Sequence, residues 1–347
     1  MDSRERVYKA LAHESPDRCP VDFWAVDEVI ERLCAHFGVQ GESSLLDALQ
    51  VDLQFVFPRE TRLPEILPDG SWFDYMGVHR KKVKNAYCVY EEYASYPLQS
   101  VQTTEELAAY DRWPDADAFD WADFPQQVRR AHDRRFVKLH TGGIFEFAWA
   151  LRGYEQFMID LVEQPEIVHF IMGKLCDFWC AFVGKAMEAA GDEIDMVYTY
   201  DDIAAQNSLL MSRAMLEEFI YPYHRRLNSV IKSYGKPIMY HSCGAVRPVI
   251  GDLCGLGIDV LNPLQPLAKG MDFAAIKREY GDRLCFHGGI DLQRLLPTGS
   301  PAEVRGAVRA AIAALGAGGG YIMTSAHYIQ NDVPTENILA MYDPAIR

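Results

Sequence analysis

Short apolar runs alternate with longer amphipathic stretches through the second half of the chain. Brief buried strands separated by helices are typical of repeated β-α units around a parallel sheet. The predicted strands are Val21–Trp24, Phe136–His140, Met196–Tyr200, Pro237–His241, Ile258–Asn262, Leu284–His287 and Tyr321–Ser325.

The stretches between these strands predict helices, among them Ser212–Ser233, Phe273–Tyr280 and Pro301–Leu315. Ser300 is a suitable N-cap for the last of these, and its first position is a proline. The glycine-rich run Gly316–Gly320 then ends that helix and precedes the next strand. A phosphate-binding loop would follow its strand, and no Gly-x-Gly-x-x-Gly follows any predicted strand. The pattern therefore does not favour dinucleotide binding.

Predicted strands that are each followed by a helix or a long loop favour an α/β fold of the (β/α)8 TIM barrel type over an open doubly wound sheet. We expect residues 1–347 to form a single barrel domain. A typical barrel needs about 250 residues, and most of the excess lies before Phe136. Residues 52–96 are rich in Tyr, Phe and Val and contain the turn signal Pro68-Asp69-Gly70. They predict an N-terminal β-hairpin insertion, able to cover the barrel mouth.

Charge and targeting signals narrow the class of protein. The 347 residues include 34 Lys+Arg and 49 Asp+Glu, a net charge of −15, which argues against binding to nucleic acid or an anionic membrane. The N-terminus Met1–Arg6 is too charged for a signal peptide, and no uninterrupted apolar run reaches about 18 residues. The eight cysteines lack the spacing of a disulfide framework. We predict a soluble cytoplasmic protein with reduced thiols.

Candidate chemistry gathers at the predicted carboxyl ends of the strands, where barrel enzymes keep their sites. His241 and Cys243 lie two residues apart at a strand end, so their side chains can converge on one point. Imidazole and thiolate are ligands suited to Zn²⁺. Two ligands do not make a zinc site. Without a third ligand, we interpret the pair as a barrel-interior histidine beside a structural cysteine. The candidates for a third ligand are His327, Asp201 and Asp202.

The adjacent carboxylates Asp201 and Asp202 follow an apolar strand. Such a pair can bind metal, act as a general base, or shift one another's pKa. The alternative is that Asp201 caps a helical turn while Asp202 is solvated. Their position at a strand end favours function, so the predicted catalytic residues are Asp201, Asp202 and His327.

Other polar and aromatic side chains near the strand ends predict a substrate pocket, suited to an aromatic or macrocyclic ligand if the aromatic side chains are not simply core. His287 is at least as well explained as a core histidine, and Cys176 and Cys180 as packing residues of one apolar helix. The predicted substrate-binding residues are Trp24, Phe145, Tyr200, Gln206, Asn262, Gln265 and Asp291.

An ordered series of motifs covering most of the chain resembles the uroporphyrinogen decarboxylase superfamily. This resemblance implies a (β/α)8 barrel with its site at the carboxyl ends of the strands, in agreement with the pattern above. The motifs are Arg4–Pro20, Leu151-Arg-Gly153, Asp201-Asp-Ile-Ala-Ala-Gln206, Gly235-Lys-Pro237, His241-Ser-Cys-Gly244, Gly257–Gln265, Phe286-His-Gly-Gly-Ile-Asp291, Gly319–Ile322, His327 and Val333-Pro-Thr-Glu-Asn337.

Two branches of that superfamily differ in chemistry. The decarboxylases carry an arginine-rich segment after the first strand, where this chain has Val21–Asp27 with two acids and no arginine. The chain is more similar to the zinc-dependent methyltransferases that work with corrinoid proteins, such as methylcobamide:coenzyme M methyltransferases. His241 and Cys243 match their His-x-Cys zinc ligands, while His327 stands in place of the late cysteine. This exchange leaves a His/Cys/His zinc site or no zinc, and we favour zinc because histidine is a competent ligand.

The resemblance thus implies a zinc-dependent methyltransferase with His241, Cys243 and His327 as metal ligands. The methyl group would move between a small-molecule donor or acceptor and a corrinoid (cobalamin), carried by a partner protein. Zinc would hold an acceptor thiol as thiolate or polarise the donor's heteroatom. Asp201 or Asp202 would serve as a further ligand, a proton acceptor or a partner of a ligating imidazole.

Two other functions stay open at this point. One is a metal-independent decarboxylase or lyase acting on a small carboxylated or tetrapyrrole-like substrate, with Asp202 and His327 as its acid and base. The other is a non-catalytic protein that binds a corrinoid or tetrapyrrole. The sequence leaves the methyl donor, the methyl acceptor and the oligomeric state open, a homodimer being one option.

Overall fold

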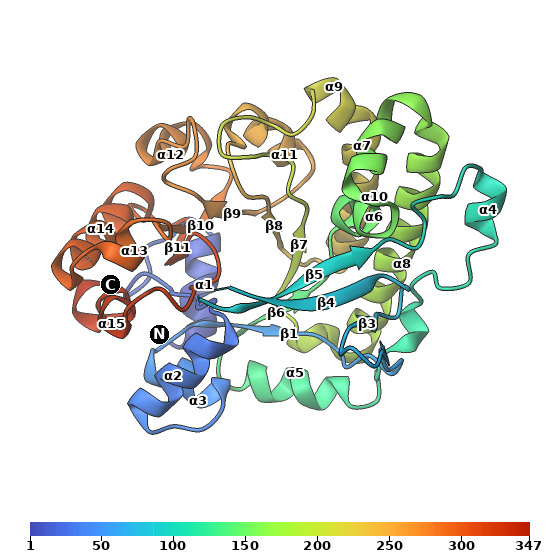
Figure 1. Cartoon of the computed structure of the whole chain (residues 1–347). Helices are drawn as coiled ribbons and strands as arrows, with labels where there is room; N and C mark the ends of the chain where they lie inside the picture. Colours follow the sequence, from blue (N-terminus) through green and yellow to red (C-terminus); the bar gives the residue numbers. More distant parts are fainter. Residues whose placement is uncertain (86) are drawn as a thin grey trace.

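A curled parallel sheet forms the centre of the computed structural model, which describes residues 1–85 and 87–347 (Figure 1). Neighbouring strands pair in parallel throughout this sheet, so all their carboxyl ends lie at the same edge. In spatial order the strands are β1 (Leu53–Val56), β6 (Phe136–His140), β7 (Met196–Tyr200), β8 (Ile238–His241), β9 (Val260–Leu264), β10 (Cys285–Ile290) and β11 (Tyr321–Ser325).

The N-terminal segment connects the two edge strands of this sheet. The Asp22 N–H donates to the carbonyl of Met323 in β11 at 3.0 Å, and the Asp52 N–H beside β1 donates to the carbonyl of Val21 at 2.9 Å. The hydrogen bonds therefore continue from β11 through Val21 to β1, which is consistent with a (β/α)8 barrel. The predicted strand Val21–Trp24 takes part only through isolated bridges.

Helices follow the strands and surround the sheet (Figure 1). They are α1 (Ser3–Leu11), α2 (Asp27–Phe37), α3 (Glu42–Ala48), α4 (Thr104–Ala108), α5 (Phe124–His132), α6 (Ile144–Arg152), α7 (Tyr154–Glu163), α8 (Pro165–Ala190), α9 (Arg213–Met215), α10 (Tyr221–Ser233), α11 (Ile250–Gly255), α12 (Phe273–Tyr280), α13 (Leu295–Thr298), α14 (Pro301–Leu315) and α15 (Thr335–Met341).

The local sequence explains the start of one helix and the interruption of another. At α14 the Ser300 hydroxyl accepts from the Glu303 N–H, and the Glu303 carboxylate accepts from the Ser300 N–H, which forms a capping box. The predicted helix Ser212–Ser233 is instead interrupted by a π-helical turn at Leu216–Ile220 before α10 begins. Pro222 at the start of α10 has no N–H to continue the helical ladder, which accounts for the break.

The long helix α8 belongs to the core. Together with the turn after it, it is long and apolar enough to cross a membrane, judged by length and composition alone. Buried core helices pass the same test, and Cys176, Trp179 and Phe182 are buried here at 1% exposure or less. The apolar helix predicted around Cys176 and Cys180 is thus confirmed, and it extends over Pro165–Ala190.

A second, antiparallel sheet lies between β1 and α4. Its strands are β2 (Glu65–Ile66), β3 (Trp72–Phe73), β4 (His79–Lys84) and β5 (Val89–Ser95), paired in that order. The predicted insertion over residues 52–96 therefore needs correction at its start, because Leu53–Val56 is a strand of the main sheet. It also contains more than one hairpin.

The β4–β5 hairpin reaches the loop that follows β11. The Cys88 thiol and the Tyr90 hydroxyl both donate to Gln330 Oε1, at 3.1 and 2.8 Å, and the Val89 N–H donates to Glu28 Oε1 at 3.2 Å. In Figure 1 this hairpin (teal) crosses the view in front of the main sheet. The insertion is thus anchored close in sequence to His327.

A buried carboxylate joins the N-terminal segment to the sheet. Asp52 is fully buried and accepts hydrogen bonds from Arg6 at 2.7 Å, from Arg18 at 2.7 Å and from the Val21 N–H at 2.9 Å. It therefore holds α1 and the connection between β11 and β1 at one point.

We expect Asp52→Asn to lower the free energy of unfolding by about 3–5 kcal/mol, because it leaves two guanidinium groups without their buried partner. Urea denaturation measures this loss. The matched control is Asp120→Asn, whose partner Arg59 is 81% exposed, with an expected loss below about 1 kcal/mol. Equal losses in the two variants would contradict the role assigned to Asp52.

Candidate metal centre

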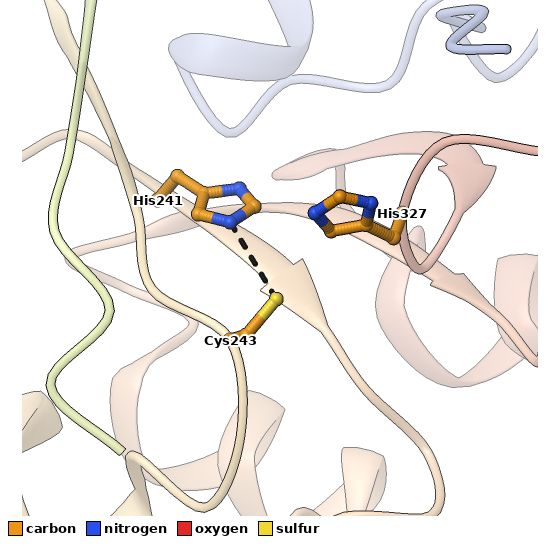
Figure 2. Close-up of side chains that lie close together, drawn as sticks. All are labelled: His241, Cys243 and His327. Atoms are coloured by element: carbon orange, nitrogen blue, oxygen red, sulfur yellow. Dashed lines mark hydrogen bonds between the residues drawn. The ribbon is translucent and has the colours of Figure 1, made fainter. Parts of the chain in front are cut away.

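Three side chains from two strand ends converge on one point (Figure 2). His241 is the last residue of β8, Cys243 follows it by two positions, and His327 follows β11. Their potential ligand atoms all lie within 4.8 Å of one another. His241 Nε2 lies 3.5 Å from Cys243 Sγ, and the centroids of the His241 and His327 rings are 5.5 Å apart.

This donor set fits zinc in both spacing and chemistry. Zinc bonds of about 2.0–2.3 Å at the tetrahedral angle place ligand atoms about 3.4–3.8 Å apart. The 3.5 Å between His241 Nε2 and Cys243 Sγ falls in that range, and His327 needs only a small adjustment to join them. Three protein ligands leave one coordination position free, as in catalytic zinc sites.

Burial prepares the two imidazoles for metal binding. It lowers the pKa of both His241 and His327 to about 4, so both rings are neutral at neutral pH and offer a lone pair. Burial also raises the pKa of the Cys243 thiol. A cation bound here would reverse that shift and release the thiol proton.

The loops that carry the cluster are tied to one another. The Cys243 N–H donates to Asp202 Oδ1 at 2.7 Å, and the Gly244 N–H donates to Gln265 Oε1 at 2.8 Å. Gly244 has φ +90°, and a Cβ there would lie 2.5 Å from the Ala205 carbonyl oxygen. Only glycine fits this close approach, which fixes Cys243 beside the loop after β7.

Asp201 has a structural role that differs from the predicted catalytic one. It is fully buried, and its carboxylate accepts from the N–H groups of Ile144, Phe145 and Glu146 at 2.8–3.0 Å. Its Oδ2 also lies 2.6 Å from His224 Nε2. The carboxylate thus satisfies the first N–H groups of α6, and these contacts engage both of its oxygens.

Asp202 is the carboxylate beside the cluster. Its Oδ1 lies 3.6 Å from His241 Nε2, and its side chain is partly exposed. Partial burial raises the pKa of Asp202, while the hydrogen bond from the Cys243 N–H acts in the opposite direction. Of the two adjacent carboxylates, Asp202 is the one that is partly exposed beside the cluster.

A small cavity of about 60 Å³ adjoins His327. Gln265 connects it to the cluster, since its Nε2 donates to Cys243 Sγ at 3.2 Å and its Oε1 accepts from Gln206 Nε2 at 3.0 Å. The Asp291 carboxylate accepts from the Gln293 N–H at 2.8 Å on another wall. The lining residues are Gln206, Gln265, Pro266, Leu267, Asp291, Leu292, Gln293, Ala326 and His327.

The three aromatic side chains predicted to bind substrate have different surroundings. Trp24 is 3% exposed and stacks on His241, with 6.1 Å between the ring centroids. Tyr200 is partly buried, 5.8 Å from the ring of His140. Phe145 is fully buried against other core side chains, so the prediction that it binds substrate is wrong.

Asn262 also departs from its predicted contact with substrate. It is fully buried, and its Oδ1 lies 2.5 Å from His241 Nδ1, on the side of the ring away from Cys243. Asn262 Nδ2 also contacts His287 Nδ1, and His287 Nε2 in turn lies 2.9 Å from Asp22 Oδ2. The strand-end pattern does not predict these contacts, although Lys138, a charged residue in the middle of an apolar strand, signals a buried polar partner.

Glu146 is a second residue that the sequence analysis missed. It lies in α6, and its Oε1 accepts from the Asp202 N–H at 3.1 Å. Burial and the nearby carboxylates of Asp201 and Asp202 raise its pKa to about 8. Nothing in the local sequence distinguishes this glutamate from a solvated helix residue.

Comparison with known proteins identifies the family. The sequence pattern of the family described as Uroporphyrinogen decarboxylase (URO-D) matches residues 126–346, more than half of the chain. The chain belongs to this family.

Relatives in the family have two activities. The chain is 22% identical over 206 residues to a uroporphyrinogen decarboxylase of Chlorobaculum tepidum, covering 58% of this chain and 53% of that protein. It is 27% identical over 199 residues to a methylated-thiol–coenzyme M methyltransferase of Methanosarcina mazei, covering 56% and 49%. The matched region thus spans about half the length of these relatives.

A solved structure extends the similarity of fold to the whole chain. A methyltransferase from Methanosarcina mazei aligns with a TM-score of 0.71 at 16% identity, covering 98% of this chain and 97% of that one. The chain therefore shares its α/β fold with that methyltransferase.

Glu146 gives a pH dependence of stability that can be measured. Its pKa is 4.5 when unperturbed and about 8 in the folded protein, so between these values the folded state binds more protons than the unfolded state. Stability from this group is therefore complete below about pH 4.5 and is lost as the pH rises through 8.

We expect Glu146→Gln to reduce the loss of stability between pH 5 and pH 8, measured by urea denaturation of the metal-free protein. Glu155→Gln, which removes an exposed carboxyl of α7, is the control and should follow the unmodified protein. Parallel pH profiles for Glu146→Gln and the unmodified protein would contradict this assignment.

Proposed function

We propose that this chain is a zinc-dependent methyltransferase that moves a methyl group between a small substrate and a corrinoid (cobalamin) carried by a partner protein. The observation that carries the proposal is the convergence of His241 Nε2, Cys243 Sγ and the His327 ring within 4.8 Å. The fold shared with a Methanosarcina mazei methyltransferase supports it. We also propose that the chain is one (β/α)8 domain that works in the cytoplasm.

His241, Cys243 and His327 would hold the zinc and leave a position for substrate. A bound Zn²⁺ would supply Lewis acidity, either lowering the pKa of a substrate thiol or polarising the heteroatom that bears the methyl group. The neutral state of both imidazoles suits this role, because a protonated ring could not coordinate.

The neighbouring side chains would bind substrate and move its proton. Asp202, partly exposed beside His241, would accept the proton that a substrate thiol releases on binding. The Gln265 amide donates to Cys243 Sγ, and it would stabilise the negative charge of that sulfur after deprotonation. Gln206 and Asp291 would contact the part of the substrate that lies in the cavity beside His327.

The charge of the cavity argues against a substrate with many carboxylates. Within the described residues, its lining contains amides, apolar side chains, Asp291 and His327, with no lysine or arginine. A polycarboxylate needs cationic partners to offset its desolvation. Asp22 stands where the decarboxylases have arginines. It forms a buried ion pair with Lys138, so this lysine is already paired and does not face a substrate carboxylate.

Metal analysis tests the proposal first. We expect about one zinc per purified chain by mass spectrometry, lost in Cys243→Ala and retained in His327→Cys, which replaces one good zinc ligand with another. Asp291→Asn changes a cavity residue that is no ligand and should keep its zinc. Metal-free protein from a preparation with zinc present would refute the proposal and favour the metal-independent lyase with Asp202 and His327 as acid and base.

An activity assay with free methylcobalamin and 2-mercaptoethanol tests the reaction itself. The methyl group would pass to the thiol sulfur, giving a thioether and cob(I)alamin, which is followed by its absorbance under anaerobic conditions. We expect Asp202→Asn to lower the rate by about 10²–10⁴-fold while zinc is retained, because the proton acceptor is lost. An unchanged rate in Asp202→Asn would exclude Asp202 from proton transfer.

A further inference from the structure

A continuous chain of buried polar side chains runs from the barrel interior to His241. Lys138 Nζ is paired with Asp22 Oδ2, which lies 2.9 Å from His287 Nε2. The Asn262 amide connects the two imidazoles, with Nδ2 bonded to His287 Nδ1 and Oδ1 lying 2.5 Å from His241 Nδ1. Four of these side chains, those other than His241, are exposed by 2% or less.

The Asp22 carboxylate sets the direction of each hydrogen bond between itself and His241. A carboxylate only accepts, so His287 must donate from Nε2 and, as a neutral ring, accept at Nδ1. Asn262 must then present its NH₂ group to His287 and its oxygen to His241. An oxygen can only accept, so the His241 proton is located on Nδ1.

The ionised state of Asp22 is itself secured by its surroundings. Burial alone would raise the pKa of Asp22, but the Lys138 ammonium and the His287 ring hold it well below its ordinary range. The Trp24 indole N–H also donates to Asp22 Oδ2, at 2.9 Å. Lys138 is in turn 3.8 Å from the centre of the Phe55 ring, a favourable position for a buried cation.

We propose that Asp22, His287 and Asn262 are positioning residues that hold His241 in the tautomer with its proton on Nδ1 and its Nε2 lone pair facing Cys243 and His327. The opposite tautomer would direct an N–H group at the cluster and exclude a metal. The importance of this tautomer for catalysis rests on the proposed function, but the tautomer itself exists without metal and can be measured in the metal-free protein.

The direct test is the ¹⁵N NMR spectrum of metal-free protein labelled with ¹⁵N-histidine, with the His241 signal assigned from the His241→Ala variant. We expect the chemical shifts of a protonated Nδ1 and an unprotonated Nε2. A protonated Nε2 in the unmodified protein would overturn the proposal.

Two substitutions of His287 distinguish the effect of its hydrogen bonds from the effect of its packing. His287→Gln keeps a donor for Asp22 and an acceptor for Asn262, whereas His287→Phe keeps volume but removes both. We expect His287→Gln to preserve the His241 tautomer and its zinc affinity within about threefold. His287→Phe should give mixed tautomers and a zinc affinity lower by about 10–100-fold.

His169→Phe is the matched control, because His169 contacts Tyr223 and is not part of the hydrogen-bonded series from Lys138 to His241. It should leave both the tautomer and the zinc affinity unchanged. Equal zinc affinities for His287→Phe and His287→Gln would overturn the proposal. If His287→Phe does not fold, a folded His287→Gln variant in which His241 no longer has its proton on Nδ1 would also overturn the proposal. Failure of the unmodified protein to bind zinc would refute the proposed function alone, since the tautomer is measured without metal.

Discussion

The curvature of the parallel sheet is the constraint on which the candidate site depends. His241 and Cys243 follow β8, and His327 follows β11, three strands further along the sheet. In a flat sheet, strands so placed would lie about 14 Å apart, too far to share an ion. Curling brings the two imidazole rings to 5.5 Å, and the segment at Val21 continues the hydrogen bonding between the edge strands. The cluster is therefore a product of the curled sheet.

The concave side of this curled sheet contains several buried polar groups, whereas the core of a typical barrel is filled by branched apolar side chains. Lys138, Asp22 and His287 are buried at 2% exposure or less, and burying such groups is costly unless every one of them is paired. Each has its partner here, and the chain ends at His241. These buried groups fix the orientation and the tautomer of the His241 ring through its Nδ1 contact with Asn262. Apolar neighbours would leave the ring free to rotate and to change tautomer.

Much of the fold could be predicted from the sequence, because β6, β7 and β11 are apolar runs whose ends carry clear signals. Strand β1 was assigned to the insertion, since its short Leu-Gln-Phe-Val pattern resembles the strand of a hairpin. The grouping of His241, Cys243 and His327 could be predicted from residue types at strand ends and from a family resemblance. Capping of a helical turn by Asp201 is one of the two alternatives that the sequence offers, but which helix it caps, and the burial of Phe145, depend on the groups that α6 presents to the end of β7. Those contacts are set by packing between elements.

Zinc K-edge X-ray absorption of the purified protein tests the central claim most directly, because it reports the atoms around the ion. We predict one sulfur at about 2.3 Å and two imidazole nitrogens at about 2.0–2.1 Å, with one further light atom completing the tetrahedron. A zinc ion surrounded by oxygen and nitrogen alone, or by two or more sulfurs, would contradict the assignment of His241, Cys243 and His327 as its ligands.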